Sequence, residues 1–89
     1  MQSITLDDVT ISAWRSGVEI VQNNTTVFIP REAIGNLSII NEMKYSMVTY
    51  IPVHSHTNMP VQLASWYNEK VLSNNAHIAY EFIKKVLYL

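Results

Sequence analysis

Two adjacent asparagines, Asn23 and Asn24, stand between two runs of alternating apolar and polar residues, and this pattern constrains the fold more than any other feature of the chain. Asparagine tolerates the left-handed backbone conformation that both central residues of a two-residue hairpin turn can require. A period of two places alternate side chains on opposite faces of a sheet. The pattern therefore predicts a β-hairpin that joins residues 18–21 to residues 26–29.

A third alternating run, over residues 9–14, precedes this hairpin. Gly17 can supply the positive φ of a tight turn after Arg15 and Ser16. We therefore expect a three-stranded antiparallel meander. Its core face should carry the apolar residues of the three runs: Val9, Ile11, Ala13, Val18, Ile20, Val27 and Ile29.

A helix is expected next, over about residues 31–43. Pro30 has the φ of a first helical turn, and four apolar residues recur at the spacing of a core-facing stripe: Ala33, Ile34, Leu37 and Ile40. Gly35 weakens this helix, which is explained if another backbone approaches it closely. Residues 47–53 are rich in β-formers and are closed by Pro52, so they predict a short strand of the kind found at a sheet edge.

Two further helices are expected after the polar segment 54–58. Asn58 could cap a helix that contains Pro60 in its first turn and reaches Leu72, and its core stripe would be Leu63, Ala64, Tyr67 and Val71. Residues 73–75 break the pattern, and a last helix should span about 76–89. The predicted fold is α+β: a single domain over residues 1–89, with an antiparallel meander of three or four strands packed against about three helices, the last two forming a helical hairpin.

The composition points to a partner surface. Hydrophobic residues make up 48% of the 89-residue chain and charged residues only 15%, whereas about a quarter is usual for charged residues. So few charges cannot cover the surface, and contiguous apolar surface usually marks an interaction site. The net charge is −1, and the six lysines and arginines are spread along the sequence. Nucleic acid is therefore an unlikely partner.

Several aromatic residues fall off the predicted core faces. Trp14, Val21 and Phe28 share the outer face of the meander, and Trp66 falls on the polar side of its predicted helix. Cross-strand packing on a solvated face, or a cover formed by the N-terminal segment, is the alternative explanation. We expect an interface anchored by Trp14, Val21, Phe28, Trp66, Tyr80 and Tyr88, because large aromatic residues supply much of the binding energy at interfaces.

Catalytic and metal chemistry have little support in the sequence. His54 and His56 would point to the same side of an extended segment, and His77 could complete a three-histidine shell, but the pair has no carboxylate nearby. The chain has no cysteine and only two glycines, so it has neither a thiol nucleophile nor a glycine-rich phosphate loop. We expect no enzyme activity, no catalytic residue, no cofactor and no bound metal.

We therefore expect a small non-enzymatic protein that self-associates as a homodimer and binds another protein. Asp7 and Asp8 interrupt any signal peptide, and no stretch could span a membrane, so we expect a cytoplasmic protein. The abundance of Ile and Asn, with little Gly, Pro and Ala, is typical of AT-rich genomes, including those of many phages and mobile elements. A phage accessory protein that modulates a host protein fits this composition. The alternatives are a nucleic-acid-binding transcriptional regulator and a His-dependent metalloprotein.

Overall fold

The computed structural model of the protein describes residues 1–54, 56–68 and 74–89. These residues form seven strands, one turn of 3₁₀ helix and one α-helix. The first four strands are β1 (Gln2–Leu6), β2 (Val9–Trp14), β3 (Gly17–Gln22) and β4 (Thr25–Pro30). The 3₁₀ turn η1 (Arg31–Ala33) leads to β5 (Ile34–Asn41), β6 (Tyr45–Pro52) and β7 (Val61–Tyr67), and α1 (Asn75–Leu87) follows.

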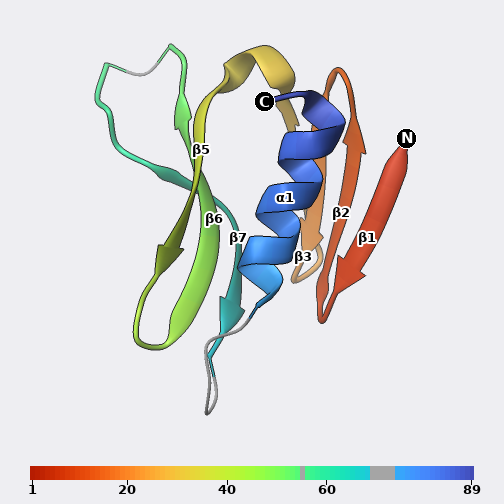
Figure 1. Cartoon of the computed structure of the whole chain (residues 1–89), viewed down its shortest axis with the longest axis vertical. Helices are drawn as coiled ribbons and strands as arrows, with labels where there is room; N and C mark the ends of the chain where they lie inside the picture. The colour runs from red at the N-terminus through yellow and green to blue at the C-terminus, as the bar shows by residue number, and fades with distance from the viewer. Residues whose placement is uncertain (55, 69–73) are drawn as a thin grey trace.

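The strands form two antiparallel sheets that hold α1 between them. One sheet has the order β1-β2-β3-β4 and the other has the order β5-β6-β7. In Figure 1 α1 lies between β1 and β2 on one side and the β5–β7 sheet on the other. The helix packs against strands of both sheets, and the sheets also contact each other directly through β3 and β7.

A single hydrophobic core joins the three layers. The helix contributes Ala76, Ala79, Ile83 and Leu87, whose spacing places them on one side of α1. The sheets contribute Val9, Ile11, Ala13, Val18, Ile20, Ile29, Ile34, Val48, Leu63, Ala64 and Trp66. Within the described residues, no helix has the length and hydropathy that a membrane span requires.

The predicted meander is present as β2, β3 and β4, and β1 adds a fourth strand to it. Asn23 and Asn24 both have left-handed backbone angles, with φ of 53° and 61°, as the hairpin prediction requires. The expected core face is buried with one exception, Val27, which is 47% exposed. β4 lies at the edge of its sheet, and within this sheet α1 packs on β1 and β2, so Val27 is not covered by the helix.

The predicted helix over residues 31–43 is wrong. Pro30 initiates only the single 3₁₀ turn η1, and the chain then enters the eight-residue strand β5. Only Leu37 among residues 34–41 is a strong helix former, whereas the three isoleucines favour a strand. Gly35 does admit a second backbone, as expected, because a Cβ at this position would lie 2.6 Å from the carbonyl oxygen of Ile51.

The predicted helix over residues 60–72 is also wrong, because residues 61–67 form β7. A register shift in the pairing with β6 makes Leu63 and Ala64 both buried, although they are consecutive. Two consecutive buried apolar residues also occur in the core-facing stripe of a helix, so the bulge gives this strand a helix-like sequence pattern. Residues 69–73, which include the end of the predicted helix and the start of the predicted break, lie outside the described residues.

The predicted arrangement of a meander on three helices, with a closing helical hairpin, is therefore incorrect. Of the three predicted helices, the described residues contain only the last, as α1. The predicted strand over residues 47–53 is present as β6, but it lies at the centre of its sheet, between β5 and β7, and not at an edge.

Candidate interaction site

The edge strand β5 has an open side with little of the protection that sheet edges usually carry. Among the described strands it pairs only with β6, and its eight residues include no charged residue and no proline. Exposed edges are usually blocked by charges, proline, bulges or a covering element. The one irregularity in β5 lies at its start, between Ile34 and Asn36, so the rest of the strand is regular and available for pairing.

The hairpin geometry shows which backbone groups of β5 face outward. The N–H of Glu42 donates to the carbonyl oxygen of Tyr45 at 2.7 Å, which makes these two residues a hydrogen-bonded pair. Such pairs alternate along an antiparallel ladder with pairs that are not hydrogen-bonded. The N–H and C=O groups of Leu37, Ile39 and Asn41 therefore point away from β6. In the described part of the chain, no other backbone segment bonds to them.

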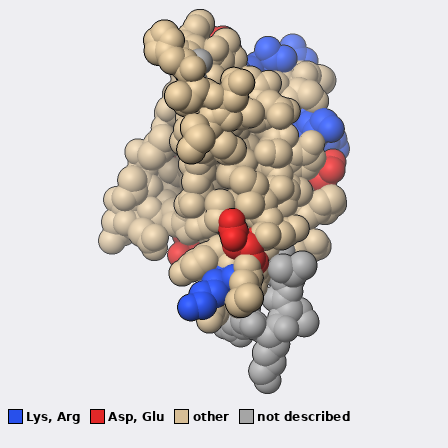
Figure 2. Space-filling model, turned by 90° about the vertical axis from the view of Figure 1, so that its left-hand side faces the viewer, with Lys and Arg blue, Asp and Glu red and all other residues tan. Residues whose placement is uncertain are grey.

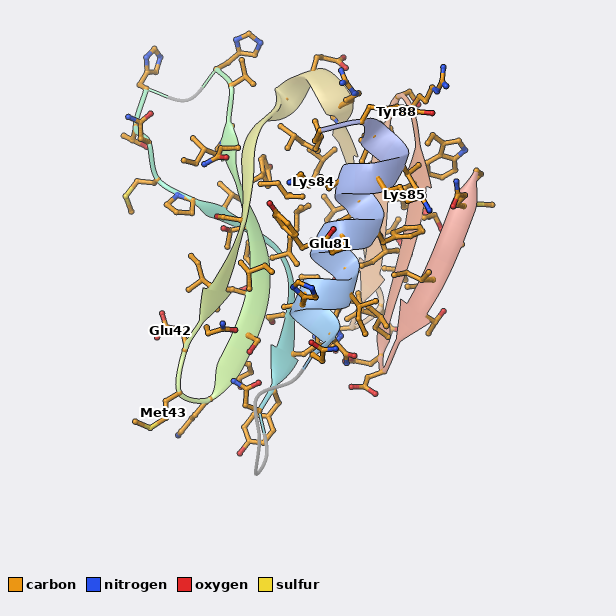
Figure 3. The ribbon with its side chains drawn as sticks, viewed as in Figure 1. Glu42, Met43, Glu81, Lys84, Lys85 and Tyr88 are labelled. Carbon is orange, nitrogen blue, oxygen red and sulfur yellow. The ribbon has the colours of Figure 1, made fainter. Side chains whose placement is uncertain are left out.

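The hairpin tip beyond β5 exposes one large apolar side chain, Met43, between the charged residues Glu42 and Lys44. Met43, at this tip, is 92% exposed, the largest fraction among the exposed large hydrophobic residues. Figure 3 shows Glu42 and Met43 projecting from the turn between β5 and β6. Tyr45 and Tyr67 pack edge to face behind the tip, with ring centroids 5.7 Å apart. Figure 2 shows that the side of the molecule formed by β5–β7 presents mainly uncharged residues.

A recess of about 240 Å³ lies at the opposite end of β5, where the strand passes the last turns of α1. Its lining is about equally polar and apolar and consists of Ile34, Gly35, Asn36, Leu37, Tyr80, Lys84 and Leu89. The Lys84 ammonium group lies 5.4 Å from the centroid of the Tyr80 ring. In Figure 3 Lys84 extends from α1 toward β5, whereas Lys85 extends toward the other sheet.

A second surface gathers cationic groups around the C-terminal end of α1. Four of the six lysines and arginines line recesses at this end: Arg15, Arg31, Lys84 and Lys85. The Nε of Arg31 donates to the carbonyl oxygen of Leu87 at 2.6 Å, which caps the helix. Arg15 donates to the hydroxyl of Tyr88 at 3.0 Å. Residues that are spread along the sequence are thus brought together by the fold.

The structure brings together some of the predicted interface residues and separates others. Trp14 and Phe28 contact each other edge to face, with centroids 6.2 Å apart, on the sheet face that carries Val21. Tyr88 is 67% exposed at the cationic end, and Tyr80 lines the β5 recess.

Trp66 lies elsewhere, in the core. It is 3% exposed, and its indole N–H donates to the carbonyl oxygen of Leu6 at 2.9 Å. The polar helix face that suggested an exposed Trp66 does not exist, because the residue is part of β7.

The open edge of β5 was not predicted from the sequence. The predicted helix over residues 31–43 excluded a strand there. The absence of charged residues over 34–41 was the sequence feature that could have indicated an unprotected edge strand.

The three histidines lie in two different parts of the fold. His54 and His56 follow β6 and His77 lies on α1. Within the described residues, no group of three His, Asp or Glu side chains could hold a metal ion.

In comparisons with protein-family models, curated proteins and solved structures, nothing matches this chain. Its function is therefore inferred from the two surfaces described above.

Proposed function

We propose that the protein is a non-enzymatic binding domain that pairs the open edge of β5 with an extended segment of another polypeptide. The observation that supports this is the set of outward-facing backbone groups at Leu37, Ile39 and Asn41, on a strand without charge. An extended peptide can add to such an edge through main-chain hydrogen bonds, while alternate side chains provide specificity.

The energetics require side-chain anchors in addition to the backbone. A net hydrogen bond contributes about 0.5–1.5 kcal/mol, and three N–H and three C=O groups are available on this edge. Association costs about 4–15 kcal/mol in lost freedom, so these bonds alone give weak binding. Burial of one large apolar side chain adds about 1.5–3 kcal/mol. Met43 at the hairpin tip and the recess beside Leu37 lie at the two ends of this edge and could receive or supply such a side chain.

The proposal includes a biological setting that rests on composition. The bias toward Ile and Asn is typical of AT-rich genomes, and the absence of cysteine suits a reducing compartment. We place the protein in the cytoplasm as an accessory protein of a phage or mobile element, where it binds and modulates a host protein.

A proline substitution tests the role of the edge. Asn41→Pro removes an outward-facing N–H without removing a hydrogen bond to β6. Asn41→Ser is the matched control, because it truncates the same exposed side chain but keeps the N–H. Proteins recovered with the tagged chain from its source cells should be lost with Asn41→Pro and retained with Asn41→Ser. A folded Asn41→Pro variant that retains every protein partner would refute the proposal.

Nucleic-acid binding is the second candidate, and the gathering of four cationic residues at the end of α1 favours it. Phosphate contacts by such groups give affinity that falls steeply with salt. Against it, Arg31 already bonds to the carbonyl of Leu87 and Arg15 to the hydroxyl of Tyr88. Salt-dependent binding of short DNA or RNA that is lost in Lys84→Ala with Lys85→Ala would favour this function over strand pairing.

A further inference from the structure

We infer that the recess lined by Arg15, Arg31 and Tyr88 is a binding site for the phosphate group of a small phosphate monoester. The recess has a volume of about 480 Å³, within the range of about 300–1,000 Å³ that is usual for small-molecule sites. It lies where the C-terminal end of α1 meets η1 and the turn between β2 and β3. The inference goes beyond the proposed function, because the site does not use the open edge of β5.

The register of the four-stranded sheet brings the two arginines together. In β3, Gly17 pairs with Pro30 of β4, so β4 ends beside the turn between β2 and β3. The backbone N–H of Arg31 donates to the carbonyl oxygen of Ser16 in that turn at 2.9 Å. This bond holds Arg31 next to the segment that contains Arg15, and both side chains reach the same recess.

Both guanidinium groups are held in place and keep unused donors. Arg15 donates to the hydroxyl of Tyr88 at 3.0 Å and lies 4.8 Å from the centroid of its ring. Arg31 donates to the carbonyl oxygens of Leu87 and Tyr88 at 2.6 and 3.4 Å. A guanidinium group has five N–H donors, so most donors of each arginine remain for a ligand. Side chains that are already fixed lose less entropy when they bind.

The backbone of Tyr88 is an independent sign that this end of the helix has a function. Tyr88 ends α1 with φ of 56° and ψ of 45°, a left-handed conformation that helix ends usually assign to glycine. A bulky residue is strained there, and the side chain of Tyr88 is 67% exposed, so little burial offsets the strain. Strained residues cluster at functional sites, and here the strained residue holds Arg15 beside the recess.

The charges around the recess favour an anion with more than one negative charge. A second recess, of about 290 Å³, shares Arg15 and Tyr88 with the first and adds Lys85. Figure 3 shows Tyr88 and Lys85 extending from α1 toward the four-stranded sheet. Among the described residues, no acidic side chain lines either recess. The three cations outweigh the partial charge of the helix end, about half an elementary charge, which Arg31 already contacts.

A phosphate monoester fits these donors better than a carboxylate does. One guanidinium group can bind both oxygens of a carboxylate, whereas a monoester has three terminal oxygens and a charge of about −1.5 to −2 at pH 7. Two guanidinium groups from different elements suit the larger number of oxygens. The second recess is lined in part by Ala13, Trp14 and Val86, so the organic group of the ester can lie against these residues.

Titration with phenyl phosphate, followed by NMR, tests the site. The ligand should shift the side-chain N–H signals of Arg15 and Arg31 with saturation, and it should bind more tightly than inorganic phosphate. Arg15→Gln should raise the Kd by about tenfold or more. Lys44→Gln is the matched control, because it removes the same charge at the distant tip between β5 and β6, and its Kd should stay nearly unchanged. Equal Kd values for the two variants would overturn the inference.

Two variants of Tyr88 separate its positioning role from folding. Tyr88→Gly relieves the left-handed strain, so the chain should stay folded, but the Kd for phenyl phosphate should rise about two- to fivefold because Arg15 loses the ring beneath it. Tyr88→Phe keeps the ring and should retain most of the affinity. An unchanged Kd in the folded Tyr88→Gly variant would overturn the positioning role.

Two further ligands test the class of phosphate. Dimethyl phosphate is a diester with a single charge, as in nucleic acid, and it should bind more weakly than phenyl phosphate. Equal binding would overturn the monoester assignment and favour the nucleic-acid candidate. A peptide that contains phosphotyrosine presents the same group on a polypeptide and should bind about as tightly as phenyl phosphate. A peptide that binds tenfold or more tightly, as an order of magnitude, would overturn the assignment to a small molecule.

Discussion

Trp66 provides the sharpest test of the fold, because the chain contains a second tryptophan in a different environment. Trp66 is 3% exposed and donates a hydrogen bond of 2.9 Å to the carbonyl oxygen of Leu6. Trp14 lies half-buried on the outer face of the other sheet, against Phe28. Truncation of Trp66 should therefore open a cavity in the core, whereas truncation of Trp14 should mainly remove a surface contact.

The expected magnitudes are large for a protein of this size. Trp66→Ala should cost about 3–5 kcal/mol, and a chain of 89 residues typically has about 4–13 kcal/mol of stability in total. Trp66→Phe keeps most of the apolar contact but leaves the Leu6 carbonyl without its donor, which costs about 1–3 kcal/mol. Trp14→Ala should cost about 1 kcal/mol, mostly from the lost edge-to-face contact with Phe28.

Urea unfolding followed by far-ultraviolet circular dichroism measures these differences without relying on the fluorescence of the altered residue. With a slope near 1 kcal/mol per molar urea, Trp66→Phe should lower the midpoint by about 1–3 M, and Trp66→Ala should be largely unfolded if stability is at the low end. The measurement is repeated at several protein concentrations, because a dimer gains stability by mass action. If Trp66→Ala costs no more than Trp14→Ala, the core assignment of Trp66 is refuted.

Leu63→Ala should lower the free energy of unfolding by about 2–5 kcal/mol, measured in urea, because Leu63 is 7% exposed in the core; an unchanged midpoint would contradict its burial. Arg31→Ala should speed amide exchange in the last turn of α1 and cost about 1–2 kcal/mol, since its Nε bonds to the carbonyl of Leu87 at 2.6 Å; unchanged exchange would show that the contact does not cap the helix. His54→Ala with His56→Ala should leave the Tm unchanged, and elemental analysis should find no stoichiometric metal; metal that disappears in the double variant would contradict this.

Local chemistry made some elements predictable. The Asn23–Asn24 hairpin depends on turn residues and a period of two within about ten residues, so both signals are contained in the segment itself. The helix α1 was predictable for a similar reason, since its buried residues form one stripe. For these segments the local preference and the tertiary environment agree.

The remaining elements depend on pairing partners distant in the sequence. Residues 61–67 have a helix-like pattern because a bulge opposite β6 buries two consecutive residues, Leu63 and Ala64. No local rule distinguishes that pattern from a helical stripe. Residues 34–41 likewise follow Pro30, which is typical of a helix start. They form a strand because they pair with β6.

The candidate sites could likewise be predicted from the sequence only in part. The deficit of charge was visible in the composition, and it indicated that some apolar surface would stay exposed. The location of that surface was decided only when β5 became an edge strand and α1 covered the inner faces of the two sheets. The cationic residues at the end of α1 were likewise separated in sequence and joined only in space. The sequence determines how many apolar, polar and charged residues the chain contains. Tertiary packing determines which of these residues share a surface, because that depends on contacts between segments remote along the chain.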